Sequence, residues 1–200
     1  MRVAVLGSTG SIGVSTLDVL GRHPDRFEVV ALAAARSHEQ LFKQCLCFRP
    51  RYAVLQDPAA AAALRSAIDD AGLATEVMHG PEALRAVARH EAVDAVMAAI
   101  VGAAGLPSTL AAAEAGKRVL LANKESLVVA GPLLVDAARH AGANLIPIDS
   151  EHNAIFQCMP GSIESGHPGN GVLRVLLTAS GGPFLRTPHE LLAHVTPQQA

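Results

Sequence analysis

Short apolar runs rich in valine, isoleucine and leucine alternate along this chain with longer amphipathic segments rich in alanine and leucine. The short runs predict buried strands, and the longer segments predict helices. The predicted strands are residues 2–6, 27–33, 52–55, 76–78, 95–98, 119–122 and 144–147. The predicted helices are residues 12–21, 38–47, 58–70, 81–89, 106–115 and 127–140. This alternation predicts an α/β fold with a Rossmann-like, doubly wound parallel sheet.

The pattern changes after Pro147. Residues 160–171 are rich in proline, glycine and serine and predict a loop, and the apolar run at 172–178 predicts a further strand. Thr196 and Pro197 are typical of the first positions of a helix, so we expect the chain to be part of a longer protein. We therefore predict two domains, residues 1–148 and residues 149–200, the second being the beginning of an α+β domain.

Composition excludes several classes of protein. Half of the residues are hydrophobic and 17% are charged, which excludes an intrinsically disordered chain. A formal net charge of −2 gives no electrostatic support for binding nucleic acid. The uncharged stretch 95–113 fits a strand, a turn and a helix better than a membrane span. Three cysteines and the short apolar run before Gly7 predict a cytoplasmic protein without disulfides.

A glycine motif joins the first predicted strand to the first predicted helix. Residues 7–13 read G-S-T-G-S-I-G, a spacing that departs by one position from the usual G-x-G-x-x-G of dinucleotide-binding folds. In this position glycine turns and a helix N-terminus bind a pyrophosphate, and the hydroxyls of Ser8, Thr9 and Ser11 would add donors. The alternative is a structural turn. We expect nucleotide binding.

The end of the second predicted strand bears on which nucleotide is bound. An enzyme that selects NAD places Asp or Glu there to bind the ribose 2′-hydroxyl, whereas this chain has Ala35, Arg36 and Ser37. A guanidinium and a hydroxyl favour the 2′-phosphate of NADP. The alternative is that Arg36 is an ordinary solvated side chain and Ser37 a helix cap.

Polar residues follow a later strand, where ligands of open α/β folds bind. Lys124 would hold an anionic or oxygenated substrate, and Asn123 and Glu125 would contact the nicotinamide ribose. A polar loop followed by a capped helix is an equally good interpretation.

Asp149 and Glu151 place two carboxylates two residues apart, so both point the same way if the segment is extended. Such a pair suits Mg²⁺ or Mn²⁺, although a third ligand is required, and a helix cap at Asp149 or Ser150 is the commoner explanation. Ser180, followed by two glycines, would bind a phosphate or form a turn. The nine histidines are scattered, so zinc is unsupported.

Five segments, in collinear order over the whole chain, resemble the 1-deoxy-D-xylulose 5-phosphate reductoisomerase family. They are residues 7–13 (G-S-T-G-S-I-G), 96–105 (V-M-A-A-I-V-G-A-A-G), 121–127 (L-A-N-K-E-S-L), 149–157 (D-S-E-H-N-A-I-F-Q) and 180–184 (S-G-G-P-F).

The resemblance implies an enzyme of non-mevalonate isoprenoid biosynthesis that depends on NADPH and on Mg²⁺ or Mn²⁺. It implies that 1-deoxy-D-xylulose 5-phosphate is rearranged and reduced to 2-C-methyl-D-erythritol 4-phosphate by a homodimer. Each subunit would contain an NADPH domain, a catalytic domain and a C-terminal helical domain. The family's active-site loop and third metal carboxylate are expected beyond residue 200.

The resemblance also implies roles for individual residues. The implied cofactor contacts are Thr9, Gly10, Ser11, Ile12, Arg36, Ser37, Asn123 and Glu125. The implied substrate contacts are Lys124, Ser150, Glu151 and Ser180. Asp149 and Glu151 are the implied metal ligands, and with Lys124 they are the implied catalytic residues. Relatives often read Gly-Lys-Asn at positions 35–37, so the charge is kept there while the finer contacts differ.

Two other hypotheses remain open from the sequence. The chain by itself would be a non-catalytic NADP-binding module, which the missing third ligand favours. The second hypothesis is that the chain is a different NADP-dependent oxidoreductase. The D-S-E-H-N segment argues against it.

Overall fold

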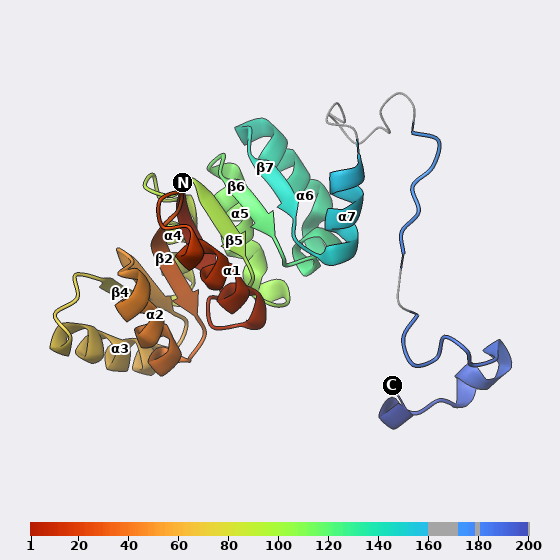
Figure 1. Ribbon diagram of the computed structural model, residues 1–200, viewed down its shortest axis with the longest axis horizontal. Coiled ribbons are helices and arrows are strands. Elements are labelled where there is room, and N and C mark those ends of the chain that lie inside the picture. The colour runs from red at the N-terminus through yellow and green to blue at the C-terminus, as the bar shows by residue number, and fades with distance from the viewer. Residues whose placement is uncertain (160–171, 179–180, 200) are drawn as a thin grey trace. The chain divides into compact units, whose positions relative to one another are not determined.

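Seven parallel strands form the centre of the first of two units, Met1–Asp149 and Ser150–Ala200, in the computed structural model (Figure 1). The structure describes residues 1–159, 172–178 and 181–199. The strands are β1 (Arg2–Leu6), β2 (Glu28–Ala34), β3 (Tyr52–Leu55), β4 (Glu76–His79), β5 (Ala95–Ala98), β6 (Arg118–Leu121) and β7 (Asn144–Pro147). The predicted α/β class and parallel sheet are confirmed, while the functional assignment of two domains stays a prediction.

The helices of the first unit follow the strands in turn. They are α1 (Ser11–Arg22), α2 (His38–Phe48), α3 (Pro58–Asp70), α4 (Gly80–Arg89), α5 (Leu106–Glu114) and α6 (Glu125–Ala141), with a short 3₁₀ turn, η1 (Ala103–Gly105), before α5. No helix among the described residues is both long and apolar enough to span a bilayer. The uncharged stretch 95–113 forms β5, a turn and α5.

The strand order is β4-β3-β2-β1-β5-β6-β7. The chain moves outward from β1 to β4, then returns to the other side of β1 and moves outward from β5 to β7. The topological switch point therefore lies between β1 and β5, at whose carboxyl ends open α/β sheets bind their ligands. Leu6 at the end of β1 pairs in register with Ala33 of β2 and Ala98 of β5, so the loops that follow these strands start side by side.

Two hydrophobic cores cover the two faces of the sheet. On one face α1, α2 and α3 bury side chains such as Leu17, Leu41 and Leu64 against the strands. On the other face α4, α5 and α6 do the same with side chains such as Leu84 and Leu134. Because both faces are covered, the central strands are continuously apolar, which is why the sequence pattern locates them well.

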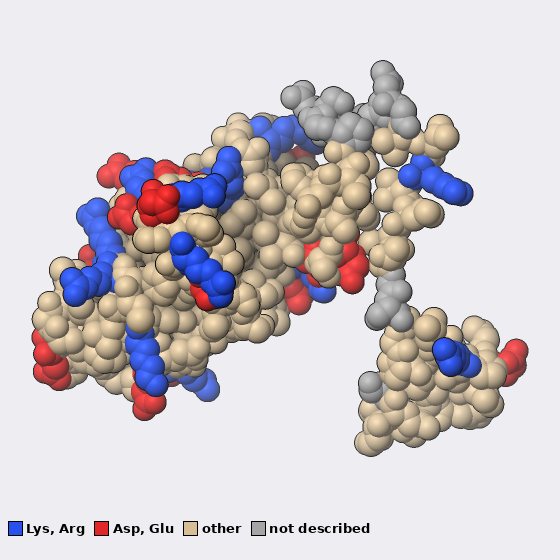
Figure 2. Space-filling model, viewed as in Figure 1, with Lys and Arg blue, Asp and Glu red and all other residues tan. Residues whose placement is uncertain are grey.

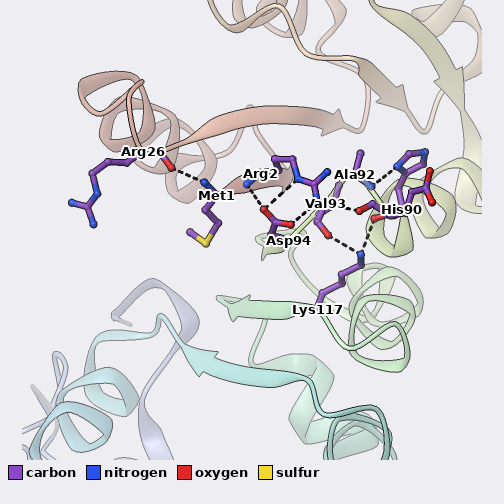
Figure 3. Close-up of polar contacts among 9 residues, drawn as sticks. Met1, Arg2, Arg26, His90, Ala92, Val93, Asp94 and Lys117 are labelled. Carbon is purple, nitrogen blue, oxygen red and sulfur yellow. Dashed lines mark hydrogen bonds and ion pairs between the residues drawn. The ribbon is translucent and has the colours of Figure 1, made fainter.

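A polar network ties the amino-terminal ends of β1 and β5 together, at the edge opposite the loops that follow the carboxyl ends of the strands (Figure 3). The Arg2 guanidinium donates to Asp94 at 2.8 Å, and the Arg2 amide donates to the same carboxylate at 2.7 Å. Lys117 Nζ donates to the carbonyl oxygens of His90 and Val93 at 2.8 and 2.7 Å. These hydrogen bonds hold together the amino-terminal edge of the sheet. The loops after β1, β2 and β5 lie at the opposite, carboxyl edge.

Among its described residues, the second unit contains α7 (Ser150–Cys158) and the 3₁₀ turns η2 (His189–His194) and η3 (Pro197–Gln199). The strand predicted at residues 172–178 is wrong: the segment forms no strand, and Leu173 is 98% exposed. A strand needs a neighbour to satisfy its backbone, and none of the described residues pairs with this run. The Thr196 amide donates to Gln199 Oε1 at 2.8 Å, so the predicted helix start is present as a single 3₁₀ turn.

Candidate functional site

The glycine loop is shaped by close approaches that only glycine permits. Gly7 follows β1 with a φ of +87°, and a Cβ there would lie 2.5 Å from the carbonyl oxygen of Ala99, just beyond β5. A Cβ on Gly13, in the first turn of α1, would overlap the carbonyl oxygen of Gly7. The loop therefore lies tightly between the two strands at the switch point, and α1 starts directly on top of it.

The N-terminus of α1 is open to an anion. Gly10 occupies the N-cap position without a side-chain cap, and the first turn of α1 contains no acidic residue. Gly10, Ser11 and Ile12 are exposed and Thr9 is half-buried. Uncapped amides and the positive end of the helix dipole are the features that bind a pyrophosphate in such loops. The predicted cofactor residues Thr9, Gly10, Ser11 and Ile12 thus lie together where an anion has access.

Ser8 does not face that anion position. Its side chain is fully buried, and its hydroxyl donates to Gln44 Oε1 of α2 at 2.7 Å. The expectation that the Ser8 hydroxyl adds a donor for a phosphate is therefore wrong, because a buried polar group takes an internal partner. Sequence reasoning missed Gln44. Its position between Leu41 and Cys45, on the buried face of α2, could have indicated that its amide takes an internal partner.

Arg36 and Ser37 lie at the carboxyl end of β2, beside the glycine loop. The Arg36 side chain is 86% exposed, and its Nε lies 3.8 Å from the Asp57 carboxylate, a weak ion pair at the surface. Ser37 occupies the N-cap position of α2, but its hydroxyl makes no capping hydrogen bond. Both polar groups are therefore available to a ligand that reaches from the glycine loop.

Asn123 follows β6 and is only 2% exposed. Its amide group donates to the carbonyl oxygens of Ile100 and Gly102, and its Oδ1 accepts from the Ser126 amide at 2.8 Å and hydroxyl at 2.6 Å. A Cβ on Gly105 would lie 2.6 Å from the Asn123 side chain. Asn123 thus connects the loop after β5 to the start of α6. Its predicted contact with the cofactor stays a prediction.

Lys124 and Asp149 meet at the carboxyl edge because β6 and β7 are neighbours in the sheet. Lys124 Nζ lies 2.8 Å from Asp149 Oδ2; the Lys124 side chain is 60% exposed and that of Asp149 only 18%. Glu125, half-buried, begins α6 directly after Lys124. An ammonium and a carboxylate therefore lie together at the edge where the sheet is expected to bind its ligand.

The segment after Asp149 is helical, which agrees with a helix cap at Asp149 or Ser150 and not with the extended arrangement that would point both carboxylates the same way. Helix α7 begins at Ser150, whose hydroxyl donates to Glu151 Oε2 at 2.7 Å. Polar residues at the start of a helix favour this conformation because they bond to nearby groups there. Within residues 1–159, 172–178 and 181–199, no three His, Cys, Asp or Glu side chains gather as a metal site. Ser180 lies outside the described residues.

The doubly wound sheet, its glycine loop at the switch point and the open start of α1 define an α/β protein of the dinucleotide-binding type. Comparison with known families then identifies the particular one. The family model for 1-deoxy-D-xylulose 5-phosphate reductoisomerase matches residues 3–131, and that for the C-terminal domain of the same enzyme matches residues 145–200. The chain belongs to the 1-deoxy-D-xylulose 5-phosphate reductoisomerase family.

Curated relatives with the name 1-deoxy-D-xylulose 5-phosphate reductoisomerase are closely similar in sequence. The protein of Methylococcus capsulatus is 61% identical over 199 residues, covering 99% of this chain and 50% of its own length. The protein of Aromatoleum aromaticum is 62% identical over 199 residues, covering all of this chain and 49% of its own length. The chain thus spans about half the length of the curated relatives it matches.

Solved structures of the family share the fold. A DOX-P reductoisomerase in complex with NADPH, fosmidomycin and magnesium has a TM-score of 0.90 and 46% identity over all of this chain, which covers 50% of that protein. The enzyme from Zymomonas mobilis in complex with NADPH has a TM-score of 0.91 and 48% identity, with the same coverage.

Proposed function

We propose that this chain is the NADPH-binding half of an enzyme that rearranges and reduces 1-deoxy-D-xylulose 5-phosphate to 2-C-methyl-D-erythritol 4-phosphate with a divalent cation. The observation that carries the proposal is the open start of α1 on the glycine loop, with Arg36 and Ser37 beside it at the same edge of the sheet. Family relatives solved with NADPH and magnesium support it.

The residues fit the cofactor in its adenosine half. Residues 9–12 would bind the pyrophosphate through backbone amides and hydroxyls, because no side chain caps the helix there. Arg36 and Ser37 would bind the 2′-phosphate, and Asn123 and Glu125 would contact the nicotinamide ribose. When bound, NADPH supplies the hydride for the reduction. Close backbone contacts around Gly7 and Gly13 would hold the loop in place as the cofactor binds.

The catalytic side of the proposal rests on Lys124, Asp149 and Glu151. Lys124 would bind an anionic or oxygenated group of the substrate, with Ser150, Glu151 and Ser180 as further contacts. Asp149 and Glu151 would supply two oxygen ligands to Mg²⁺ or Mn²⁺, which when bound polarises substrate oxygens. Hard carboxylate oxygens suit either ion, but they are two ligands of the six or so required. In this structure the Asp149 carboxylate forms an ion pair with the Lys124 ammonium group.

The proposed function also includes an oligomeric state, a compartment and a domain organisation. We propose a small-molecule enzyme that acts as a homodimer in the cytoplasm, without a nucleic acid or membrane partner. On the face shown in Figure 2, basic and acidic side chains are interspersed, which does not favour binding to a polyanion. The three cysteines are free, as is usual in a reducing compartment. Residues 1–148 would be the NADPH domain and residues 149–200 the beginning of the catalytic domain.

A chimera tests the proposed activity. The first half of the Methylococcus capsulatus relative is replaced by this chain, and NADPH oxidation is followed with 1-deoxy-D-xylulose 5-phosphate and Mg²⁺. We expect substrate-dependent turnover that is abolished by Asp149→Asn, while NADPH affinity stays near that of the parent chimera. A folded chimera that binds NADPH without turnover would instead favour a non-catalytic NADP-binding module.

A further inference from the structure

Gln44 of α2 binds the glycine loop with both ends of its side-chain amide. Its Oε1 accepts from the Ser8 hydroxyl at 2.7 Å, and its Nε2 donates to the Ser8 carbonyl oxygen at 2.8 Å. Ser8 is fully buried. If the Gln44 amide were removed, the Ser8 hydroxyl and carbonyl oxygen would be left without these partners in an apolar setting, which is costly.

The same loop is also tied to the end of β2. The backbone amides of Gly7 and Ser8 both donate to the carbonyl oxygen of Ala33, at 2.9 and 2.8 Å. The loop is therefore anchored at two points of the chain, Ala33 and Gln44, which lie on either side of Arg36 and Ser37. These bonds fix the position of residues 9–12 relative to the residues that would meet the 2′-phosphate.

We propose that Gln44 is a positioning residue for the cofactor, one that sets the spacing between the pyrophosphate loop and the 2′-phosphate residues without itself contacting the cofactor. The inference rests on the proposed binding of NADPH. A ligand that bridges two subsites binds best when their spacing is fixed beforehand, since it then loses less free energy in ordering them. NADPH bridges both subsites, whereas NADH lacks the 2′-phosphate and gains less from the fixed spacing.

The test compares Gln44→Leu with Gln40→Leu. Both glutamines lie on α2 and line the same groove between α1 and α2, but only Gln44 bonds to the loop. Dissociation constants for NADPH and NADH are measured by fluorescence titration. We expect Gln44→Leu to raise the dissociation constant for NADPH about tenfold and that for NADH by a smaller factor. The preference for NADPH over NADH should therefore decrease. Gln40→Leu should leave both values unchanged.

A change in global stability would scale both affinities alike, so the ratio between NADPH and NADH separates positioning from a merely structural role. Unaltered selectivity in a folded Gln44→Leu protein overturns the inference. If Gln44→Leu does not fold, Ser8→Ala is used instead, because it removes one of the two hydrogen bonds between Ser8 and Gln44. It should lower the preference for NADPH over NADH about threefold. An unchanged preference in Ser8→Ala also overturns the inference. Failure of the wild-type chain to bind NADPH would instead contradict the proposed function.

Discussion

Arg36, Lys124 and Asp149 could be assigned as candidates from the sequence because each follows an apolar run that predicts a strand. The position of a residue after a strand depends on local pattern, which the sequence displays directly. Contacts between residues far apart in the sequence could not be predicted in this way. Gln44 is 36 residues from Ser8, and Asp149 is 25 residues from Lys124, so these contacts depend on the order of strands in the sheet.

Asp94 gives a pH-dependent prediction. Hydrogen bonds from the Arg2 guanidinium and amide lower the pKa of Asp94 from 3.8 to about 2. A carboxyl group whose pKa is lowered on folding stabilises the native state above its unfolded pKa, and this stabilisation is lost as the pH falls from about 4 towards 2. The pair is nearly half exposed, so water screens much of the interaction.

We therefore expect Asp94→Asn to lower the melting temperature by about 1–3 °C at neutral pH. The difference from the wild type should shrink as the pH falls from about 4 towards 2, because an increasing fraction of Asp94 is then protonated in the native state. Thermal unfolding followed by circular dichroism across this range measures it. A difference that stays constant with pH would show that Asp94 does not contribute through its charge. Asp18→Asn, in an exposed pair with Arg22, is the control and should have a smaller effect.

The three cysteines differ in reactivity for physical reasons. Cys45 is buried in the core beneath α2, and burial raises the pKa of its thiol to about 12. Cys47 and Cys158 are exposed. Because the thiolate is the reactive form, we expect two thiols to react with a disulfide reagent at about pH 8 in the native protein and a third only in denaturant. Rapid reaction of all three thiols without denaturant would contradict this burial.

At the scale of elements, the seven strands were predictable because a sheet covered on both faces requires continuous apolar runs. Residues 172–178 have the same composition and form no strand, which shows the limit of this reasoning. Apolar composition favours a strand, but hydrogen bonds to a neighbouring strand complete it. The start of α7 at Ser150 agrees with the helix cap that the sequence indicates at Asp149 or Ser150.

The junction between β1 and α1 gives a prediction at this scale. We expect Gly13→Ala to destabilise the chain by about 1–3 kcal/mol, because the added Cβ would overlap the carbonyl oxygen of Gly7 and the backbone of Ser8. NADPH affinity should also fall more than about tenfold, since α1 must move off the loop. Urea denaturation and cofactor titration measure the two effects.

Gly21→Ala is the matched control within the same helix, because a Cβ there would meet the Phe48 ring at 3.5 Å, an ordinary van der Waals contact. It should change stability by less than about 0.5 kcal/mol or slightly increase it. Equal effects of the two substitutions would show that the close approach at Gly13 does not shape the loop.

At the scale of the whole molecule, the order of the strands places the chemistry. The reversal between β1 and β5 brings the glycine loop, the loop after β5 and the residues after β2 to one edge of the sheet. The predicted Rossmann-like, doubly wound sheet implies a reversal of strand order, and the structure places that reversal between β1 and β5. Family membership agrees with this arrangement, and the chain spans half the length of its relatives.

In the proposed function, the carboxyl edge of the sheet binds NADPH in preference to NADH. The most direct measurement is a fluorescence titration of the chain with each cofactor, repeated with Arg36→Ala. We expect NADPH to bind about ten- to a hundredfold more tightly, because the guanidinium meets the 2′-phosphate in a charge-assisted contact. In Arg36→Ala the two affinities should become nearly equal. Equal affinities in the wild type, or a preference for NADPH that survives in Arg36→Ala, would contradict the proposed binding of the 2′-phosphate by Arg36.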